Sequence, residues 1–221
     1  MTPEEILQGL YDETLVGNAP RVLELTDEGL KLQMEPQTLL FDALIPSLEE
    51  VGARFERGDF FVPEMLIAGR AMAGAMEVLR PLLAETGVQT VGKFLMGTVK
   101  GDVHDIGKNL VNIMLEGAGF QVFDLGVQVP PERFVEAINE YKPDIVGFSA
   151  FLTTTMPMFK ANINALEKAG IRDQVVVMVG GAPVTQEYAD AVGADAYAAD
   201  ASQTVKKAKE LIKKKRSRVS A

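Results

Sequence analysis

A change of hydrophobic rhythm near residue 90 limits the folds open to this sequence. Residues 3 to 86 repeat apolar side chains at three- and four-residue spacing, which is typical of amphipathic helices. From Lys93 onward, short β-rich runs alternate with helical stretches, which is typical of βαβ units on a parallel sheet. The segment ETGVQTVG between them is expected to be a linker. We therefore expect two domains, residues 1-88 and 92-215.

The first domain is predicted to be a bundle of four helices. Thr2 as a possible N-cap, followed by Pro3, marks the start of the first helix. Short connections at Gly17-Asn18 and Gly58-Asp59 imply antiparallel neighbours, as in a small bundle. The apolar stripes, helix by helix, are Ile6, Leu7, Leu10 and Tyr11; Val22, Leu23 and Leu30; Phe41, Leu44, Leu48, Val51 and Phe55; and Met65, Ala68, Met72, Met76 and Leu79.

The second domain is predicted to contain five strands and five helices. This alternation is the pattern of a flavodoxin-like doubly wound sheet, whose ligands bind beyond the carboxyl ends of the strands where the strand order switches. The predicted fold is thus α+β, with a helical bundle followed by a flavodoxin-like α/β domain. The strands are expected at Phe94–Val99, Gln121–Leu125, Ile145–Ser149, Val175–Val179 and Ala196–Ala198, and the helices at Gly107–Ala118, Pro131–Glu140, Met156–Lys168, Thr185–Val192 and Ala201–Lys214.

The composition narrows the possible functions. The net charge of −9 argues against nucleic acid as the main partner, and the basic run from Lys206 to Arg218 is interpreted as a solvated helix end. The chain has no cysteine, which removes disulfides, thiolate nucleophiles and cysteine-ligated metal centres. No apolar run approaches ~20 residues and the N-terminus is acidic, so we expect a cytoplasmic protein without a membrane partner.

The loop from Gly101 to Asn109 carries the most informative chemistry. His104 is the one histidine of the chain, and Asp102 is close enough in sequence for its carboxylate to bond one ring nitrogen and leave the other free for a metal. Gly107 permits the close approach of something bulky at the start of the following helix. The structural alternative is an Asp-rich turn in which the histidine caps that helix.

A lone imidazole restricts the kind of metal site. Structural and catalytic zinc sites use three or four protein ligands, and adding Asp102 and Asp105 would give a poor, oxygen-rich set. A metal already held by a macrocycle needs only one axial ligand from the protein. The pattern therefore indicates a tetrapyrrole-type cofactor without choosing among them.

Three ordered elements of the sequence resemble the motif of cobalamin-binding domains. Residues 102–107 (DVHDIG) match DxHxxG, Ser149-Ala150-Phe151 lies at the SxL element with Phe in place of Leu, and Gly180-Gly181 matches the GG element. The helical segment, with GDFFVPE at residues 58–64, resembles the cap that precedes this module in methionine synthase and in small methyltransferase corrinoid proteins. The stretches SAFLTTTMP and DLGVQVP resemble the small corrinoid proteins most.

The resemblance implies a base-off/His-on cofactor site. The dimethylbenzimidazole base would leave the cobalt for a slot in the α/β domain, and His104 would take its place as the lower axial ligand. Asp102 would bond the other imidazole nitrogen and Thr155 would extend this relay. The implied cofactor-binding residues are Val103, Asp105, Ile106, Gly107, Ser149, Leu152, Thr153, Gly180, Gly181, Ala201 and, as the cap aromatic, Phe61.

Simpler interpretations of several of these residues stay open. Residues 153–155 would also serve as an N-cap run for the next helix, and Gly180-Gly181 would serve as a tight turn. Met65 and Ala68, further candidates for the cap above the cobalt, would also be ordinary core residues.

The function implied by the resemblance is that of a corrinoid methyl carrier in one-carbon metabolism. Co(I) would take a methyl group through a substrate-specific methyltransferase, and the methylcobalamin form would deliver it through a second methyltransferase, with a reductive activase as a further partner. The protein would be the non-catalytic component of this methyltransferase system. Family analogy gives methylamines, betaines, methanol or methoxylated aromatics as donors. The alternatives are a cobalamin-dependent sensor or regulator and, third, a mutase subunit.

Overall fold

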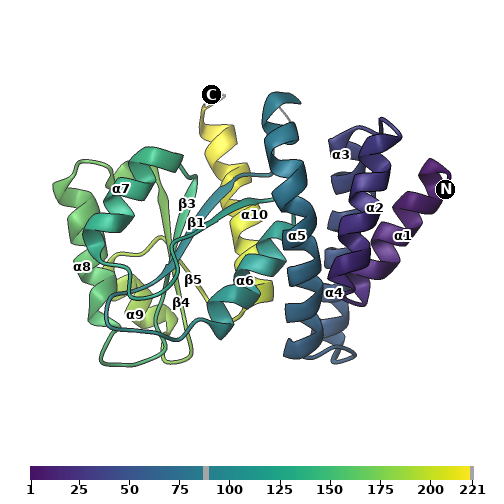
Figure 1. The fold of residues 1–221 in the computed structure, drawn as a ribbon. Helices are drawn as coiled ribbons and strands as arrows, with labels where there is room; N and C mark the ends of the chain where they lie inside the picture. Colours follow the sequence, from purple (N-terminus) through teal and green to yellow (C-terminus); the bar gives the residue numbers. More distant parts are fainter. Residues whose placement is uncertain (87–89, 220–221) are drawn as a thin grey trace. The chain divides into compact units, whose positions relative to one another are not determined.

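Figure 1 shows the computed structural model, which describes residues 1–86 and 90–219. The chain divides into two compact units. The first comprises Met1–Thr90 with Glu116–Gly119, and the second comprises Val91–Leu115 with Phe120–Ala221. The division falls within the expected linker, of which residues 87–89 lie outside the described residues.

The first unit is helical. Its first helix begins at Pro3 because Thr2 and Glu5 form a reciprocal capping box: Thr2 Oγ1 accepts from the Glu5 N–H at 3.2 Å, and Glu5 Oε2 accepts from the Thr2 N–H at 2.8 Å. The predicted third helix is a continuous run of three segments. The elements are α1 (Pro3–Leu15), α2 (Ala19–Lys31), α3 (Pro36–Leu39), the π-helical turn η1 (Leu40–Leu44), α4 (Ile45–Arg57) and α5 (Val62–Thr86).

The core of the first unit follows most of the predicted stripes, with two corrections. Leu23 is 40% exposed, because the buried face of α2 passes through Val22 and Leu25 instead. Phe41 is 37% exposed, since the wider π turn rotates it outward and buries Leu40. The other residues predicted for these stripes that are buried are Ile6, Leu10, Val22, Leu44, Leu48, Val51, Met65, Ala68, Met72 and Leu79.

The second unit contains a five-stranded parallel sheet in the order β2-β1-β3-β4-β5. This is the flavodoxin-like order, and its switch point lies between β1 and β3. The fold prediction for this segment is confirmed, and the predicted strand boundaries differ by at most one residue. The strands are β1 (Lys93–Thr98), β2 (Gln121–Asp124), β3 (Ile145–Ser149), β4 (Val176–Gly180) and β5 (Ala196–Ala198).

Helices cover both faces of this sheet (Figure 1). On one face the main core forms around Phe134, Phe148 and Phe159, which lie on α7, β3 and α8. The rings of Phe134 and Phe148 meet edge to face with centroids 4.8 Å apart. The helices, together with one 3-10 turn, are α6 (Ile106–Gly117), α7 (Pro131–Tyr141), α8 (Pro157–Lys168), η2 (Arg172–Gln174), α9 (Gln186–Val192) and α10 (Ala201–Val219).

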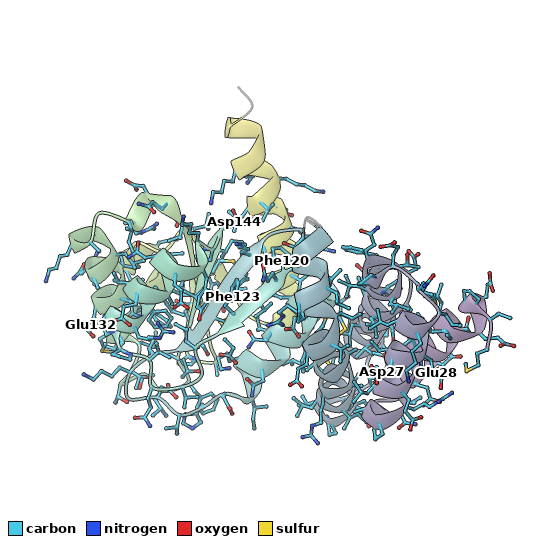
Figure 2. The ribbon with its side chains drawn as sticks, turned by 45° about the horizontal axis from the view of Figure 1, so that its top comes forward. Asp27, Glu28, Phe120, Phe123, Glu132 and Asp144 are labelled. Carbon is cyan, nitrogen blue, oxygen red and sulfur yellow. The ribbon has the colours of Figure 1, made fainter. Side chains whose placement is uncertain are left out.

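The amino end of the sheet is tied to the basic C-terminal helix. Asp144, labelled in Figure 2, accepts hydrogen bonds from the Lys93 N–H at 3.0 Å and from Lys215 Nζ at 3.2 Å. Lys207 Nζ donates to the carbonyl of Tyr197 at 2.6 Å. Two lysines of the basic run therefore bond to the unit that carries them. None of the helices described for this chain is long and apolar enough to cross a membrane.

Candidate functional site

The predicted site residues that follow β1 and β3 lie where the strand order switches. β1 and β3 pair side by side, with Thr98 opposite Ser149 at their carboxyl ends. The chain after β1 forms the loop of His104, and the chain after β3 forms the loop from Phe151 to Thr155. Ligands of doubly wound sheets bind at this point because the two loops leave in opposite directions.

The carboxylate of Asp102 joins the two loops. Its Oδ1 accepts from the backbone N–H of His104 at 3.0 Å and lies 2.7 Å from His104 Nδ1. Its Oδ2 accepts from the backbone N–H groups of Phe151 and Leu152 at 2.8 and 3.2 Å, and from the Thr155 hydroxyl at 2.7 Å. Asp102 has no exposed surface, so the protein alone satisfies its oxygens.

These bonds keep the carboxylate ionised. Burial by itself would raise the pKa of Asp102, but the hydrogen bonds from the Thr155 hydroxyl, from His104 and from the Phe151 N–H stabilise the anion more strongly. The net effect holds the pKa of Asp102 well below its usual value. An ionised carboxylate only accepts hydrogen bonds, so the proton between the two side chains belongs to His104 Nδ1.

His104 consequently presents Nε2 as its free nitrogen. In a neutral imidazole protonated on Nδ1, Nε2 carries the lone pair, and it has no hydrogen-bond partner among the described residues. The side chain is 44% exposed, and the Thr98 hydroxyl donates to the His104 carbonyl at 3.1 Å. The Phe151 ring stacks on the imidazole, with centroids 4.4 Å apart and planes 29° from parallel. The structure thus brings Asp102 and His104, which the sequence places two residues apart, into hydrogen-bond contact.

This donor set fits a metal that a macrocycle already holds. Among residues 1–86 and 90–219, no group of three His, Cys, Asp or Glu side chains is arranged to bind a bare ion. One imidazole nitrogen is enough for a metal with four equatorial ligands of its own. The side chains beside His104 offer an apolar surface to a flat ring, since Val103, Ile106, Phe151 and Leu152 are all exposed.

The hydroxyl residues at the end of β3 and in the loop after it fall into two groups. Thr155 is buried against Asp102, and the residue that precedes α8, Met156, makes no side-chain cap, so the N-cap interpretation of the threonine run is wrong. Ser149 is half-buried and Thr153 is exposed, and neither hydroxyl has a hydrogen-bond partner within the described part of the chain. Both are available to a bound group.

The glycines have different surroundings. A β-carbon on Gly107 would meet nothing within 4 Å, which leaves open space at the start of α6. A β-carbon on Gly180 would lie 3.1 Å from the Ala198 carbonyl oxygen. Gly181 has φ +133°, and a β-carbon there would lie 1.8 Å from the Ala150 carbonyl oxygen. The chain's own backbone therefore requires glycine at 181, in agreement with the tight-turn interpretation.

The remaining predicted residues lie at helix starts. Asp105 is half-buried and immediately precedes α6, where its carbonyl accepts from the Asn109 N–H at 2.7 Å. Ala201 is buried at the first position of α10. In the first unit, Phe61 is 65% exposed just before α5, whereas Met65 and Ala68 are fully buried as core residues.

Sequence reasoning missed two features of this region. The backbone N–H groups that bind Asp102 have no signature in side-chain identity, although their place beside the SxL element was a clue. The second feature is an ion pair between Lys108 on α6 and Asp124 at the end of β2. Asn112 Nδ2 also donates to Asp124 at 3.0 Å. In the sequence, the signal for this ion pair would have been a lysine on the buried face of a helix.

Comparisons with known proteins identify the family of this chain. A family model described as B12 binding domain matches residues 92–211, and a second model with the same description matches residues 6–80. The chain is 43% identical to the dimethylamine corrinoid protein of Methanosarcina barkeri over 96% of its own length and 100% of that protein. The chain belongs to the corrinoid protein family. This corrinoid protein therefore binds cobalamin.

Two further relatives extend the comparison. The corrinoid protein is 41% identical to trimethylamine corrinoid protein 1 of Methanosarcina acetivorans, over 95% of this chain and 98% of that one. The crystal structure of the methanol:cobalamin methyltransferase complex from Methanosarcina barkeri matches with a TM-score of 0.83 and 28% identity, covering 95% of this chain and 80% of that one.

Proposed function

We propose that this corrinoid protein carries methyl groups from a methylated amine, through a substrate-specific methyltransferase, to a second methyltransferase. When bound, the corrinoid supplies a cobalt that accepts a methyl group and gives it up again. The dimethylamine and trimethylamine corrinoid proteins among the relatives favour amines over the other donors. The matching methanol:cobalamin methyltransferase complex supports a methyltransferase as partner.

The observation that carries this proposal is the orientation of His104. Its Nδ1 is engaged by Asp102 at 2.7 Å, and its side chain is partly exposed among apolar neighbours. In the proposed base-off/His-on state, Nε2 of His104 would be the protein's ligand to the cobalt. Asp102 keeps the imidazole in the tautomer that leaves Nε2 unprotonated, and Thr155 holds that carboxylate in place.

The other predicted residues surround this ligand in the proposal. The unpaired hydroxyls of Ser149 and Thr153 bind the displaced nucleotide base, and the space beside Gly107 accommodates the nucleotide tail. Residues 92-215 form the cobalamin-binding domain with Val103, Asp105, Ile106, Leu152, Gly180, Gly181 and Ala201 as further contacts. Residues 1-88 form the cap domain, with Phe61 as the residue that shields the cobalt.

The proposal also includes a reductive activase and a cytoplasmic location. A cobalt that accepts a methyl cation has to be strongly reduced, and accidental oxidation then requires a reductase to return it to the cycle. The cytoplasm is a reducing compartment, which suits both the reduced cobalt and the reductase.

The first experiment tests the ligand. Protein labelled with ¹⁵N-histidine is reconstituted with hydroxocobalamin and reduced to the cob(II)alamin form for electron paramagnetic resonance. The chain has one histidine, so a ¹⁵N doublet in the superhyperfine pattern identifies His104 on cobalt, whereas a ¹⁴N triplet identifies the nucleotide base. A triplet in the wild-type protein would overturn the His-on assignment, and His104→Ala should abolish the doublet.

The second experiment tests the carrier role. The reduced holoprotein is incubated with dimethylamine or trimethylamine and an extract containing the methyltransferases. Repeated transfer of methyl groups to an acceptor is expected. Binding of cobalamin with a change of association state, and without turnover for any methyl donor, would support a sensor instead.

A further inference from the structure

We propose that Phe151 is a positioning residue for His104, whose ring sets the plane of the imidazole and hence the direction of Nε2. This inference rests on the proposed function, because the direction of Nε2 matters when that nitrogen binds a metal. Phe151 occupies the third place of Ser149-Ala150-Phe151, where the family motif has Leu.

The two rings form a stacked pair. Their centroids are 4.4 Å apart and their planes differ by 29°. Stacked aromatic pairs are favoured beyond the area that they bury, because the face of one ring complements the polarised edge and face of the other. A leucine at this position has no flat face and would leave the imidazole free to turn.

The carboxylate of Asp102 cannot set this plane by itself. The contact between Asp102 Oδ1 and His104 Nδ1 fixes one point of the ring. A coupled rotation about χ1 and χ2 of His104 can keep Nδ1 near Oδ1 while it swings Nε2 through an arc. The stacked ring of Phe151 opposes this rotation, so one point and one plane together define where Nε2 lies.

Phe151 is suited to this task because its own backbone is fixed. Its N–H donates to Asp102 Oδ2 at 2.8 Å, so the same carboxylate holds both partners of the stack. The preceding residue, Ala150, is buried, and its N–H donates to the Gly180 carbonyl at 3.2 Å. A side chain on a rigid backbone holds its neighbour in a well-defined position.

The first part of the test uses the protein without corrinoid. Phe151→Leu removes the aromatic face and Phe151→Tyr keeps it. The matched control is Phe123→Leu, which removes another stacked ring in the same unit. The centroids of the Phe123 and Tyr141 rings are 4.4 Å apart and their planes differ by 12° (Phe123 is labelled in Figure 2). The single histidine gives one set of imidazole signals by NMR.

We expect the carbon-bound imidazole protons to be shifted upfield by the Phe151 ring current in the wild type, in Phe151→Tyr and in Phe123→Leu. The shift should be lost in Phe151→Leu. Imidazole signals that stay unchanged in Phe151→Leu would overturn the stacking. This result is independent of cobalamin and therefore of the proposed function.

The second part measures the equilibrium between His-on and base-on cobalamin by the ¹⁵N doublet and ¹⁴N triplet described above. Phe151→Leu should lower the His-on equilibrium constant by about three- to tenfold, with Phe151→Tyr within about twofold of the wild type. The positioning role would be overturned if Phe151→Leu had the same His-on equilibrium constant as the wild type. It would also be overturned if Phe151→Tyr lowered this constant as much as Phe151→Leu does. A wild-type protein that keeps the base on cobalt overturns the His-on assignment and this role together. The turnover assay with methylamines tests the carrier role separately, and the NMR arm still decides the stack.

Discussion

Thr155 and Asp102 lie 53 positions apart in the sequence, and the Thr155 hydroxyl donates a 2.7 Å hydrogen bond to Asp102 Oδ2. Both residues are buried, so water does not readily replace this donor. The bond connects the loop that follows β1 to the loop that follows β3, and it stabilises the anion that orients His104.

Replacing Thr155 with Val should therefore weaken the fold. Valine has the same shape but no donor, which leaves a buried carboxylate with one hydrogen bond fewer. We expect the free energy of unfolding to fall by about 1–2 kcal/mol in urea titrations. Thr155→Ser, which keeps the hydroxyl, is the matched control. Equal stability of Thr155→Val and the wild type would show that the bond contributes nothing.

Asp102→Asn should alter the tautomer of His104. The amide oxygen can face the three donors at the Oδ2 position, but the amide NH₂ then points at the His104 N–H and at Nδ1. Nδ1 has to accept, so the ring proton moves to Nε2. We expect ¹⁵N NMR to report this tautomer, together with a loss of about 1–3 kcal/mol in the free energy of unfolding. An unchanged Nδ1–H signal would contradict the assigned geometry.

Two glycines should respond oppositely to alanine. Gly181→Ala places a β-carbon against the Ala150 carbonyl oxygen at 1.8 Å, and φ of +133° is unfavourable for alanine. We expect it to lower the free energy of unfolding by at least about 3 kcal/mol. Gly107→Ala meets no protein atom and lies in a helix, so stability should stay equal or rise by about 0.5–1 kcal/mol.

Gly107→Ala also tests whether the cofactor occupies the space beside this residue. If the nucleotide tail fills it, as proposed, Gly107→Ala should bind hydroxocobalamin more weakly although it folds normally. Tight binding by this variant, measured by absorbance after gel filtration, would remove Gly107 from the proposed contacts.

Replacing Lys108 and replacing Asp124, the two partners of an ion pair, should lower the free energy of unfolding by different amounts. The Lys108 side chain is 2% exposed and that of Asp124 is 36% exposed. Asp124→Asn leaves a buried ammonium without a counter-charge and should lower the free energy of unfolding by about 3 kcal/mol. Lys108→Met leaves a carboxylate that water can reach, with the N–H of Gly126 still bonded to it, and should lose about 1 kcal/mol. Equal losses would refute this asymmetry.

Much of the fold follows from local patterns in the sequence. The strands around Phe94 and Ile145 are apolar runs between turn residues, and such runs identify buried parallel strands. The exposure of Phe41 was not predictable in this way, because the π turn that rotates it depends on tertiary packing. A regular 3.6-residue period is the wrong template for that one turn.

From residue chemistry alone, the contacts of the site could be predicted only where the residues are close in sequence, and the contact of Thr155 with Asp102 was expected from the family resemblance. The contact of Asp102 with His104 follows from their spacing and from the chemistry of a carboxylate beside an imidazole. The stack of Phe151 on His104 depends on the register of β1 against β3, which brings two distant loops together. The presence of Phe in place of the motif's Leu drew attention to residue 151 but did not indicate that its ring contacts His104.

The carboxylate of Asp102 has a mechanical consequence for any protein that docks at this edge of the sheet. Because its two oxygens bind both loops, neither loop can shift without breaking hydrogen bonds in a water-free environment. A docking partner therefore meets a rim of constant shape around His104. Whatever rearrangement the transfer of a methyl group demands has to be absorbed by other segments of the chain.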